Sequence, residues 1–524
     1  MALATSGVTT LWTSQPRAVA LRAPSSRYIR FYDELARRLQ AEANVRVTIE
    51  LAPSSNALPR SVELLLQLER LLLARTPAGL SKRVDPPRPS DGSDREHDIT
   101  IDFCPGETPG GQVLGIFYDG QADETALFGA LLHGRVSVLT VRDNGSGEIL
   151  SEAIPATDNA STIVESYECV LSRLLTLLVA TVGGWGSSRQ DARPTPQAPQ
   201  LAAIVRHELK SLAHIAARKL YHLCCHAPHW RTCWRRVDGD GLWSGTLGND
   251  WKIIPDPGSH FYADPFPFMH EGKEFVFVED LDHRTNKGVI SVIPFDEHGP
   301  AGPARPVLEE NWHLSYPFVF RHGDHIWMLP ESSANRSLTL YRADPFPTRW
   351  VKHAELLSDV ELSDATIVEH DGLYWMLAAT RDGGGSWSDT LSAFFARDFQ
   401  GPWTPHPANP LLIDQRMARP AGAFVKRNGT LWRPVQDCSH GYGTGVGLAE
   451  VTRLDRDGFE QRLHTIVKPA PGWPGHRFHT FNRAGRLETI DGSAHSPRNR
   501  LLARRLQGWS GRRNLGETDL SFSA

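Results

Sequence analysis

Three carboxylates stand at matching positions of a repeated sequence pattern. Asp264 and Asp364 each lie eight residues before a turn glycine, and Glu331 lies eight residues after another. Because an unpaired charge is costly to bury in an apolar core, acids repeated in this way are not expected to be core residues. Glycosidic-bond chemistry requires one carboxylic acid that gives a proton and one carboxylate that activates a nucleophile. We therefore predict all three as catalytic residues, with a polar lining that holds water or an ion as the alternative.

The pattern that positions these acids is a short apolar run, a turn and a second apolar run, repeated five times. The turn glycines are Gly272, Gly323, Gly372, Gly429 and Gly485. Their spacing of 49 to 57 residues is typical of a propeller blade or a solenoid unit. Five copies predict an all-β five-bladed propeller over residues 230–495, in which the inner strands begin around a central funnel.

Two polar residues of the fourth repeat are predicted to bind substrate. Asp437 lies eight residues after Gly429, as Glu331 does after Gly323. Arg419 opens the repeat, where its guanidinium could neutralise a phosphate or a carboxylate. The alternative for Arg419 is a surface ion pair.

Tryptophans crowd the repeats, and aromatic side chains line many small-molecule sites, including those in which sugar rings stack. Trp327, Trp375 and Trp432 follow the turns at equivalent strand positions, so we assign them to packing between strands. Trp312 and Trp387 lie outside that register. We therefore expect these two to be the better candidates for a substrate site, with Trp312 the stronger of them.

Residues 17–182 have the pattern of a small α/β domain. Strands are predicted at 17–22, 45–51, 98–103, 113–117 and 136–141, and helices at 27–43, 61–74, 124–132 and 161–182. Alternating strands and helices indicate a doubly wound, Rossmann-like sheet. Three prolines followed by Ser-Asp-Gly predict a mobile loop at 86–92.

The stretch 131–152 resembles the formyltransferase family of the methionyl-tRNA formyltransferase type. That family uses an Asn, a His and an Asp around the formyl group, but here Gly145 stands where the Asp would be and no Asn-x-His precedes it. Without these proton-handling groups the chemistry has no general acid or base. The resemblance therefore implies a retained fold without its activity, against an alternative site that uses His133 or Asp119.

Three further segments connect or follow the two domains. Residues 183–200 have the Gly, Ser and Pro content of a linker. A linking helix is predicted within 201–229, with Leu209, Leu212 and Leu220 on one face that we expect to pack on the propeller. The basic tail, residues 496–524, is expected to be a solvated surface, with weak docking to an anionic membrane as the alternative.

Composition limits the partners and the compartment. A net charge of −4 and a pI of about 6.6 give no basic footprint for nucleic acid. Six cysteines without paired spacing indicate neither a disulfide framework nor a zinc site, and no cofactor is indicated. The first 26 residues contain no apolar run typical of a signal peptide. We therefore expect a cytoplasmic protein with a sugar-containing substrate.

Ala263-Asp264-Pro265 at the start of the first repeat resembles the five-bladed glycosidases of glycoside hydrolase families 43 and 32. The run 251–492 is more similar to the propeller domain at the N-terminus of the plant glucosamine inositolphosphorylceramide transferases. Its more specific motifs are Phe-Tyr262-Ala-Asp264-Pro-Phe, Ser-Tyr316-Pro-Phe and Leu-Pro-Glu331-Ser. Tyr262 and Tyr316 are therefore predicted to bind substrate.

The resemblance implies roles for the acids only in part. Asp264 takes the place of the base, and Asp364 stands in the register of the acid. The second repeat lacks the expected Asp, so Glu331 could take over either role from the far end of its hairpin. His479 lies where these relatives place a histidine at the axis and is predicted to contact substrate. By the same analogy we expect inversion at the anomeric centre.

Two classes of function follow from these residues. The first is a carbohydrate-active enzyme with a carboxylate acid/base mechanism. Within it, glycosyl transfer in intracellular glycan or glycolipid assembly is favoured over hydrolysis of the family 43 type. The second is a non-catalytic glycan-binding propeller. Binding of a nucleotide sugar, rather than of free oligosaccharides alone, would favour transfer.

Overall fold

The structure is a computed structural model of the 524-residue chain. It describes residues 4–11, 18–53, 58–73, 79–87, 97–104, 111–158, 160–189, 194–382, 384–470, 473 and 475–499. The loop expected at 86–92 therefore lies mostly outside the described residues, as does the basic tail from residue 500 onward.

The N-terminal part contains a six-stranded mixed sheet in the order β3-β2-β4-β5-β6-β7. Its strands are Ala18–Pro24 (β2), Arg46–Ala52 (β3), Ile99–Asp102 (β4), Gln112–Tyr118 (β5), Leu139–Asp143 (β6) and Ile149–Ala153 (β7). The first four are mutually parallel, whereas β6 runs antiparallel to both β5 and β7. A doubly wound, Rossmann-like sheet was predicted, whereas the observed sheet is mixed and includes strand β7, which was not predicted. The link between β6 and β7 is too short for a parallel crossover, so these two strands form a hairpin.

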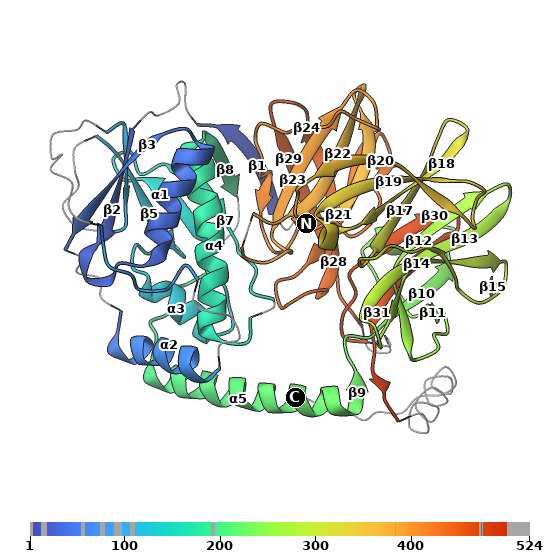
Figure 1. Cartoon of the computed structure of the whole chain (residues 1–524), viewed down its shortest axis with the longest axis horizontal. Coiled ribbons are helices and arrows are strands. Elements are labelled where there is room, and N and C mark those ends of the chain that lie inside the picture. The colour runs from blue at the N-terminus through green and yellow to red at the C-terminus, as the bar shows by residue number, and fades with distance from the viewer. Residues whose placement is uncertain are drawn as a thin grey trace. The chain divides into compact units, whose positions relative to one another are not determined.

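Four helices belong to this sheet. They are Arg30–Glu42 (α1), Arg60–Leu72 (α2), Thr125–Leu132 (α3) and Ile163–Val182 (α4). Figure 1 shows α1 and α4 side by side, and their apolar faces join the strands in one core that includes Leu35, Leu39, Leu174 and Leu178. Thr162 caps α4 by accepting a hydrogen bond from the Glu165 N–H at 3.1 Å.

The C-terminal part is a five-bladed β-propeller. Blade 1 contains His260–His270 (β12), Lys273–Asp282 (β13), Lys287–Asp296 (β14), Gly299–Pro300 (β15) and Arg305–Leu308 (β16). Blade 2 contains Ser315–His322 (β17), His325–Glu331 (β18), Ser337–Ala343 (β19) and Trp350–Ser358 (β20). Blade 3 contains Leu362–His370 (β21), Leu373–Thr380 (β22), Thr390–Ala396 (β23), Thr404–Pro405 (β24) and Leu412–Ile413 (β25). Blade 4 contains Val425–Arg427 (β26), Thr430–Asp437 (β27), Gly445–Leu454 (β28) and Phe459–Val467 (β29). All five turn glycines have positive φ, between 56° and 78°, as tight turns between paired strands require.

Blade 5 combines the two ends of the repeat region. Its strands are Trp230–Arg236 (β10), Lys252–Ile253 (β11), Phe481–Ala484 (β30) and Leu487–Ser493 (β31), in the order β11-β10-β31-β30. β10 pairs with β31 along its whole length, from Trp230 with Ser493 to Arg236 with Leu487. The fifth repeat of the sequence therefore supplies half of its blade, and a segment that precedes the first repeat supplies the other half.

Residues before the propeller also extend blade 4. Its sheet continues through Ala4–Thr10 (β1), which pairs with β29, to Trp185–Arg189 (β8). Residues 185–189 had been expected in a linker, but here they form a strand. By contacts the chain divides into residues 1–211, 331–340 and 353–466 as one unit and residues 212–330, 341–352 and 467–524 as the other.

The helix that follows is Leu201–Cys224 (α5). Leu209, Leu212 and Leu220, which we expected to pack on the propeller, are 49% to 64% exposed. The buried residues of α5 are instead Ile204 and Ser211. None of the helices in the described part of the chain is long and apolar enough to cross a membrane.

Candidate active site

Three blades begin with a residue in the left-handed backbone conformation. Asp264, Tyr316 and Asp364 have φ values of 48°, 43° and 57°. Around Asp264 and Asp364 the strand register shifts, between Ala263 and Phe266 in one blade and between residues 363 and 366 in the other. Left-handed conformations of residues other than glycine cost free energy and cluster at functional sites. The bulges therefore indicate that Asp264 and Asp364 belong to a functional site.

Asp264 is buried and receives hydrogen bonds on both carboxylate oxygens. Its Oδ1 accepts a bond from the Thr480 hydroxyl at 2.6 Å and lies 3.1 Å from His479 Nε2. Its Oδ2 accepts a bond from the Tyr316 backbone N–H at 3.2 Å. The local strain at Tyr316 thus aims a backbone donor at this carboxylate.

His479 lies between two carboxylates. Its Nδ1 is 3.1 Å from Oδ1 of Asp491, a β31 residue that is fully buried. Asp491 also accepts hydrogen bonds from the backbone N–H groups of Asp264, His479 and Thr480. Burial alone would lower the pKa of His479, but the charges of Asp491 and Asp264 outweigh burial and raise it to about 10.

The side chains of Asp264, His479 and Asp491 are also close enough together to hold a metal ion. A metal would require a neutral histidine, whereas the raised pKa of His479 favours an imidazolium between the two acids. The edge of Trp230 covers the ring, with centroids 4.3 Å apart. We therefore interpret the group as an Asp–imidazolium–Asp ion cluster that holds Asp264 in its charged form.

Replacing His479 with Gln is expected to lower the free energy of unfolding by about 2 to 3 kcal/mol near neutral pH, because two buried carboxylates lose their shared cation. The folded-state pKa of about 10 lies above the ordinary value of 6.5, so this stabilisation is full below about pH 6.5 and is lost as the pH rises through 10. Denaturant unfolding should therefore show a smaller difference near pH 10. His298→Gln, at an exposed turn, is the control, and an equal loss at both pH values would contradict the ion cluster.

A second histidine lies in the electrostatic reach of Asp264. His313 precedes β17, and its Nδ1 accepts a hydrogen bond from the Gly288 N–H at 2.9 Å. Its Nε2 lies 3.4 Å from Glu279, which pairs across the strands with Ala263 beside Asp264. Burial lowers the pKa of His313, although the Asp264 charge partly offsets that effect. The neutral imidazole of His313 therefore interacts electrostatically with Asp264. The repeat pattern did not predict this histidine.

In the other unit, Asp364 forms a buried ion pair with Arg419. The Arg419 Nε donates to Asp364 Oδ2 at 2.6 Å, and Gln436 donates to the same oxygen at 3.2 Å. The guanidinium also lies 4.8 Å from the centre of the Tyr442 ring. Burial lowers the pKa of Arg419, but Asp364, Tyr442 and Glu331 more than compensate and raise it well above its ordinary value. Of the two predictions for Arg419, the ion pair is the one observed, although it is buried rather than at the surface.

Glu331 joins this cluster through a serine. The Ser363 hydroxyl donates to Glu331 Oε2 and accepts a hydrogen bond from Arg419 at 3.0 Å. The Ser333 hydroxyl donates to the other oxygen at 2.8 Å. Glu331 is partly exposed, whereas Asp364 is 3% exposed. Serine hydroxyl groups therefore hold Glu331, whereas an arginine holds Asp364. Solvent reaches Glu331 more readily than Asp364.

The other predicted substrate-binding residues differ in accessibility. Tyr316 is fully buried with its ring against Phe266, and Tyr262 is 8% exposed within a core that includes Trp234. Asp437 is 1% exposed, and its Oδ1 accepts a hydrogen bond from the Ser439 N–H at 3.0 Å. Trp312 is partly exposed, and its indole N–H is buried without a hydrogen bond among the described residues.

Several residues of the two clusters were missed by sequence reasoning: Ser363, Gln436, Tyr442, Thr480 and Asp491. Among these residues only Asp491 was recognisable from the sequence, because it is a charged residue at the end of the second apolar run of the fifth repeat. The others lie in segments whose position relative to the acids depends on the tertiary fold.

The two residues considered for an alternative N-terminal site have structural partners. Asp119 is 4% exposed and accepts hydrogen bonds from the Val138 N–H at 2.9 Å and from Arg135 at 3.2 Å. His133 ends α3 and bonds the Gly129 carbonyl at 2.7 Å. A cavity of about 300 Å³ lies elsewhere in this part, lined by residues that include Asp102 and Glu124.

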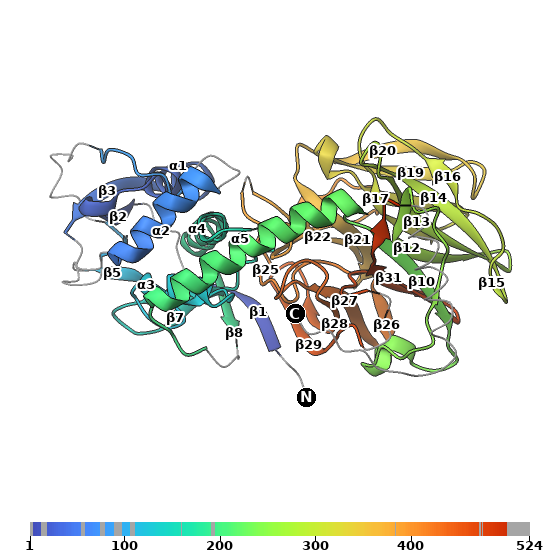
Figure 2. The same ribbon diagram turned by 90° about the horizontal axis from the view of Figure 1, so that it is seen from below.

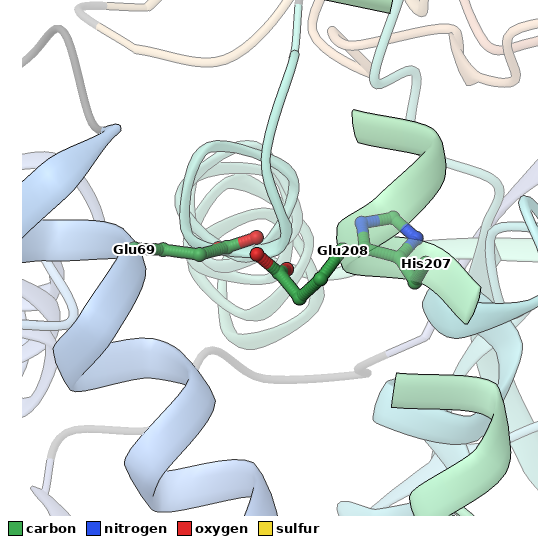
Figure 3. Close-up of side chains that lie close together, drawn as sticks. All are labelled: Glu69, His207 and Glu208. Atoms are coloured by element: carbon green, nitrogen blue, oxygen red, sulfur yellow. The ribbon is translucent and has the colours of Figure 1, made fainter. Parts of the chain in front are cut away.

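A further cluster of ionisable groups joins α2 to α5. Figure 3 shows the carboxylates of Glu69 and Glu208 turned toward each other, with His207 beside them. Glu69 is fully buried and accepts hydrogen bonds from the first N–H groups of α4, Ile163 at 3.0 Å and Val164 at 2.8 Å. Burial raises its pKa, the two N–H groups lower it, and Glu208 raises it further, to about 7. Glu69 is therefore partly protonated near neutral pH.

Replacing Glu208 with Gln is expected to raise the free energy of unfolding near pH 8 by on the order of 1 kcal/mol, because the like charge beside Glu69 is removed. The folded-state pKa of Glu69 lies above its ordinary 4.5, so its stabilisation is full below about pH 4.5 and is lost as the pH rises through 7. The variant should lose less stability over that window. Glu148→Gln, at an exposed turn, is the control. Parallel pH profiles of variant and wild type would refute the influence of Glu208 on the pKa of Glu69.

Part of the propeller is similar to a known family. The family model described as "Glucosamine inositolphosphorylceramide transferase 1, N-terminal" matches residues 254–489. Glucosamine inositolphosphorylceramide transferase 1 of Oryza sativa subsp. japonica is 34% identical over 231 residues, which cover 42% of this chain and 31% of the rice protein. The protein of the same name in Arabidopsis thaliana is 32% identical over 233 residues, covering 43% and 30%. The chain thus spans about a third of the length of the curated relatives that it matches.

Solved structures give a looser likeness. The GH43 protein BlXynB from Bacillus licheniformis matches with a TM-score of 0.31 and 21% identity, over 43% of this chain and 51% of that one. CoXyl43, a GH43 beta-xylosidase/alpha-arabinofuranosidase from a compost microbial metagenome, matches with a TM-score of 0.34 and 13% identity, over 45% and 89%.

Proposed function

We propose that the protein is a carbohydrate-active enzyme that transfers a sugar in the assembly of a glycan or glycolipid. The observation that carries this proposal is the pair of buried acids, Asp264 and Asp364, at strained and equivalent starts of two blades. Each acid is held by donors from several segments. The similarity of residues 254–489 to the N-terminal part of the plant sugar transferases supports a sugar-containing substrate.

The surroundings of the three acids support different roles. Asp264 is kept charged by His479, so we assign to it the orientation and activation of the attacking hydroxyl. Glu331 is partly exposed and held by serine hydroxyls, which suits a group that donates a proton and later recovers it. Asp364 is fixed by Arg419, and we assign to this ion pair the positioning of Ser363 and, through it, of Glu331.

The acceptor that we propose contains a sugar or inositol phosphate linked to a lipid. This rests on the name of the plant relatives, of which the matched segment is about a third. Hydrolysis of the family 43 type is a variant of the same chemistry, with water as the acceptor.

A non-catalytic glycan-binding propeller is the second candidate. It is favoured by the fact that Asp264 and Asp364 each receive several hydrogen bonds from the protein itself. For the N-terminal part we propose a formyltransferase-like fold without formyl transfer. The structural partners of Asp119 and His133 support that proposal.

A ligand panel tests the proposed function. Saturation-transfer NMR on the full chain, with nucleotide sugars in one set and free oligosaccharides in another, measures which class binds. We expect a nucleotide sugar to bind and Glu331→Gln to retain that binding. Binding of oligosaccharides alone would favour hydrolysis or recognition, and binding of neither class would remove the proposal.

A further inference from the structure

Most of the large apolar side chains that the described residues expose lie on two helices. Ten of these twelve side chains belong to α2 or α5. They are Leu64, Leu68, Leu71 and Leu72 on α2, and Leu201, Val205, Leu209, Leu212, Leu220 and Leu223 on α5. The seven that lie in the first unit, Leu64, Leu68, Leu71, Leu72, Leu201, Val205 and Leu209, are here called the leucine face. Their exposed fractions run from 48% to 80%. Contiguous apolar surface on this scale marks an interaction site or a membrane contact.

α2 and the first part of α5, residues 201–211, lie beside each other in the N-terminal part. Figure 1 shows them along the lower edge of that part, and Figure 2, seen from below, shows them toward the viewer. The contact between Glu69 and Glu208 joins them on their inner sides (Figure 3). Buried Val62, Leu65 and Ile204 mark the inner faces, so the leucine face is the outer one.

The stripe on α5 is straight. From Leu201 through Val205, Leu209 and Leu212, and on through Ala216 and Leu220 to Leu223, successive members are four or three residues apart, in the order 4, 4, 3, 4, 4, 3. This is an 11-residue repeat, which keeps close to the 3.6-residue period of a helix. This repeat does not fit a left-handed coiled coil, which requires a 7-residue repeat, and permits only a right-handed one. The stripe is therefore suited to lying along a flat surface.

The exposed charged side chains of α5 are all basic. Arg206, Lys210, Arg218 and Lys219 are exposed, whereas the one acid of the helix, Glu208, turns inward to Glu69. A basic helix with an exposed apolar stripe is typical of helices that lie in a lipid surface. Each Lys or Arg near an anionic leaflet adds to that attraction.

We propose that the leucine face docks on an anionic lipid surface, with α5 lying in the interface. The apolar side chains would enter the acyl boundary, and the four basic residues would meet lipid phosphates and carboxylates. A second copy of the chain is a poorer occupant, because two such helices would bring Arg206 and Lys210 against like charges. The proposal stands independently of the chemistry in the propeller.

Vesicle sedimentation with the full chain tests this docking. One set of vesicles is phosphatidylcholine alone, and the other is three parts phosphatidylcholine to one part phosphatidylserine. We expect the protein to sediment with the second set, and Val205→Gln/Leu209→Gln to weaken binding at least about ten-fold through lost apolar burial. Arg206→Gln/Lys210→Gln should weaken it by roughly five-fold for each charge and abolish the preference for phosphatidylserine.

Matched controls are Ile149→Gln and Met269→Gln, which replace exposed apolar residues outside the leucine face and should bind as wild type. All variants change exposed side chains, so unfolding curves should coincide. Failure of the wild type to bind either vesicle overturns the proposal, as does full binding by Val205→Gln/Leu209→Gln. Light scattering without lipid adds an independent result, since a dimer that this variant abolishes would assign the face to a second copy.

Discussion

Asp264→Asn is expected to lower turnover of the sugar substrate by about 10² to 10⁴, the usual contribution of a general acid or base. Asparagine keeps the side-chain volume and can still accept a hydrogen bond from the Thr480 hydroxyl, but it cannot take a proton from an incoming nucleophile. It also removes the charge opposite His479. The measurement is kcat and kcat/KM for a substrate identified by the ligand panel.

The stability of this variant must be measured beside its rate. Because Asp264 pairs with His479, we expect Asp264→Asn to lower the free energy of unfolding by about 1 to 3 kcal/mol. Asp282→Asn, in the same hairpin and paired with Arg284, is the control and should turn over substrate at the wild-type rate. Wild-type turnover by Asp264→Asn would place the protein in the glycan-binding class.

Arg173→Met is expected to lower the free energy of unfolding by about 3 to 5 kcal/mol, because it leaves a fully buried carboxylate without its cation. Arg173 and Asp389 are both 0% exposed, and the Arg173 Nε donates to Asp389 at 2.6 Å. Its other nitrogens donate to Asp382 at 2.8 Å and to the Ser386 carbonyl. One residue of α4 thus organises the segment between β22 and β23. Denaturant unfolding of the full chain measures the loss.

A double-mutant cycle separates this ion pair from packing. Asp389→Asn alone should also be destabilising, but Arg173→Met/Asp389→Asn should lose less than the sum, since no unpaired charge remains buried. Arg37→Met, at a pair whose arginine is 64% exposed, should change stability by less than about 1 kcal/mol. Additive losses in the cycle would contradict the buried pair.

The repeats were predictable because the paired strands of a hairpin are adjacent in the sequence. Each turn glycine marks a hairpin whose first strand, turn and second strand are adjacent in the sequence, so Gly272 and Gly372 placed Asp264 and Asp364 in matching registers. The pairing of β10 with β31 was not predictable in this way. It joins residues more than two hundred positions apart, and 230–236 lack the repeat pattern.

The surroundings of the acids were beyond sequence reasoning for a related reason. Counting residues matched Ser315 to Asp264, but the backbone gives the left-handed conformation to Tyr316. Arg419 was predicted at the site from its place in the repeat, but its buried partner Asp364 was not predicted. A side chain of the fifth blade supplies the cation for Asp264, and only the fold brings the two together.

In the N-terminal part the α/β class and most elements followed from periodicity. Predicted helices at 61–74 and 161–182 correspond to α2 and α4. The alternation did not reveal the hairpin of β6 and β7, nor the contribution of β1 and β8 to blade 4. Strand direction at a sheet edge depends on connection length more than on composition. For α5, amphipathicity was read correctly, but its apolar stripe faces outward.

The central claim is that the acids of the propeller make a glycosidic bond, and product analysis tests it most directly. The full chain would be incubated with the nucleotide sugar that binds and with an inositol-phosphate lipid acceptor, and the lipid examined by mass spectrometry. The account predicts an acceptor heavier by one sugar with wild type, and almost none with Asp264→Asn or Glu331→Gln. An acceptor left unchanged by wild type, with donor bound but intact, would contradict it.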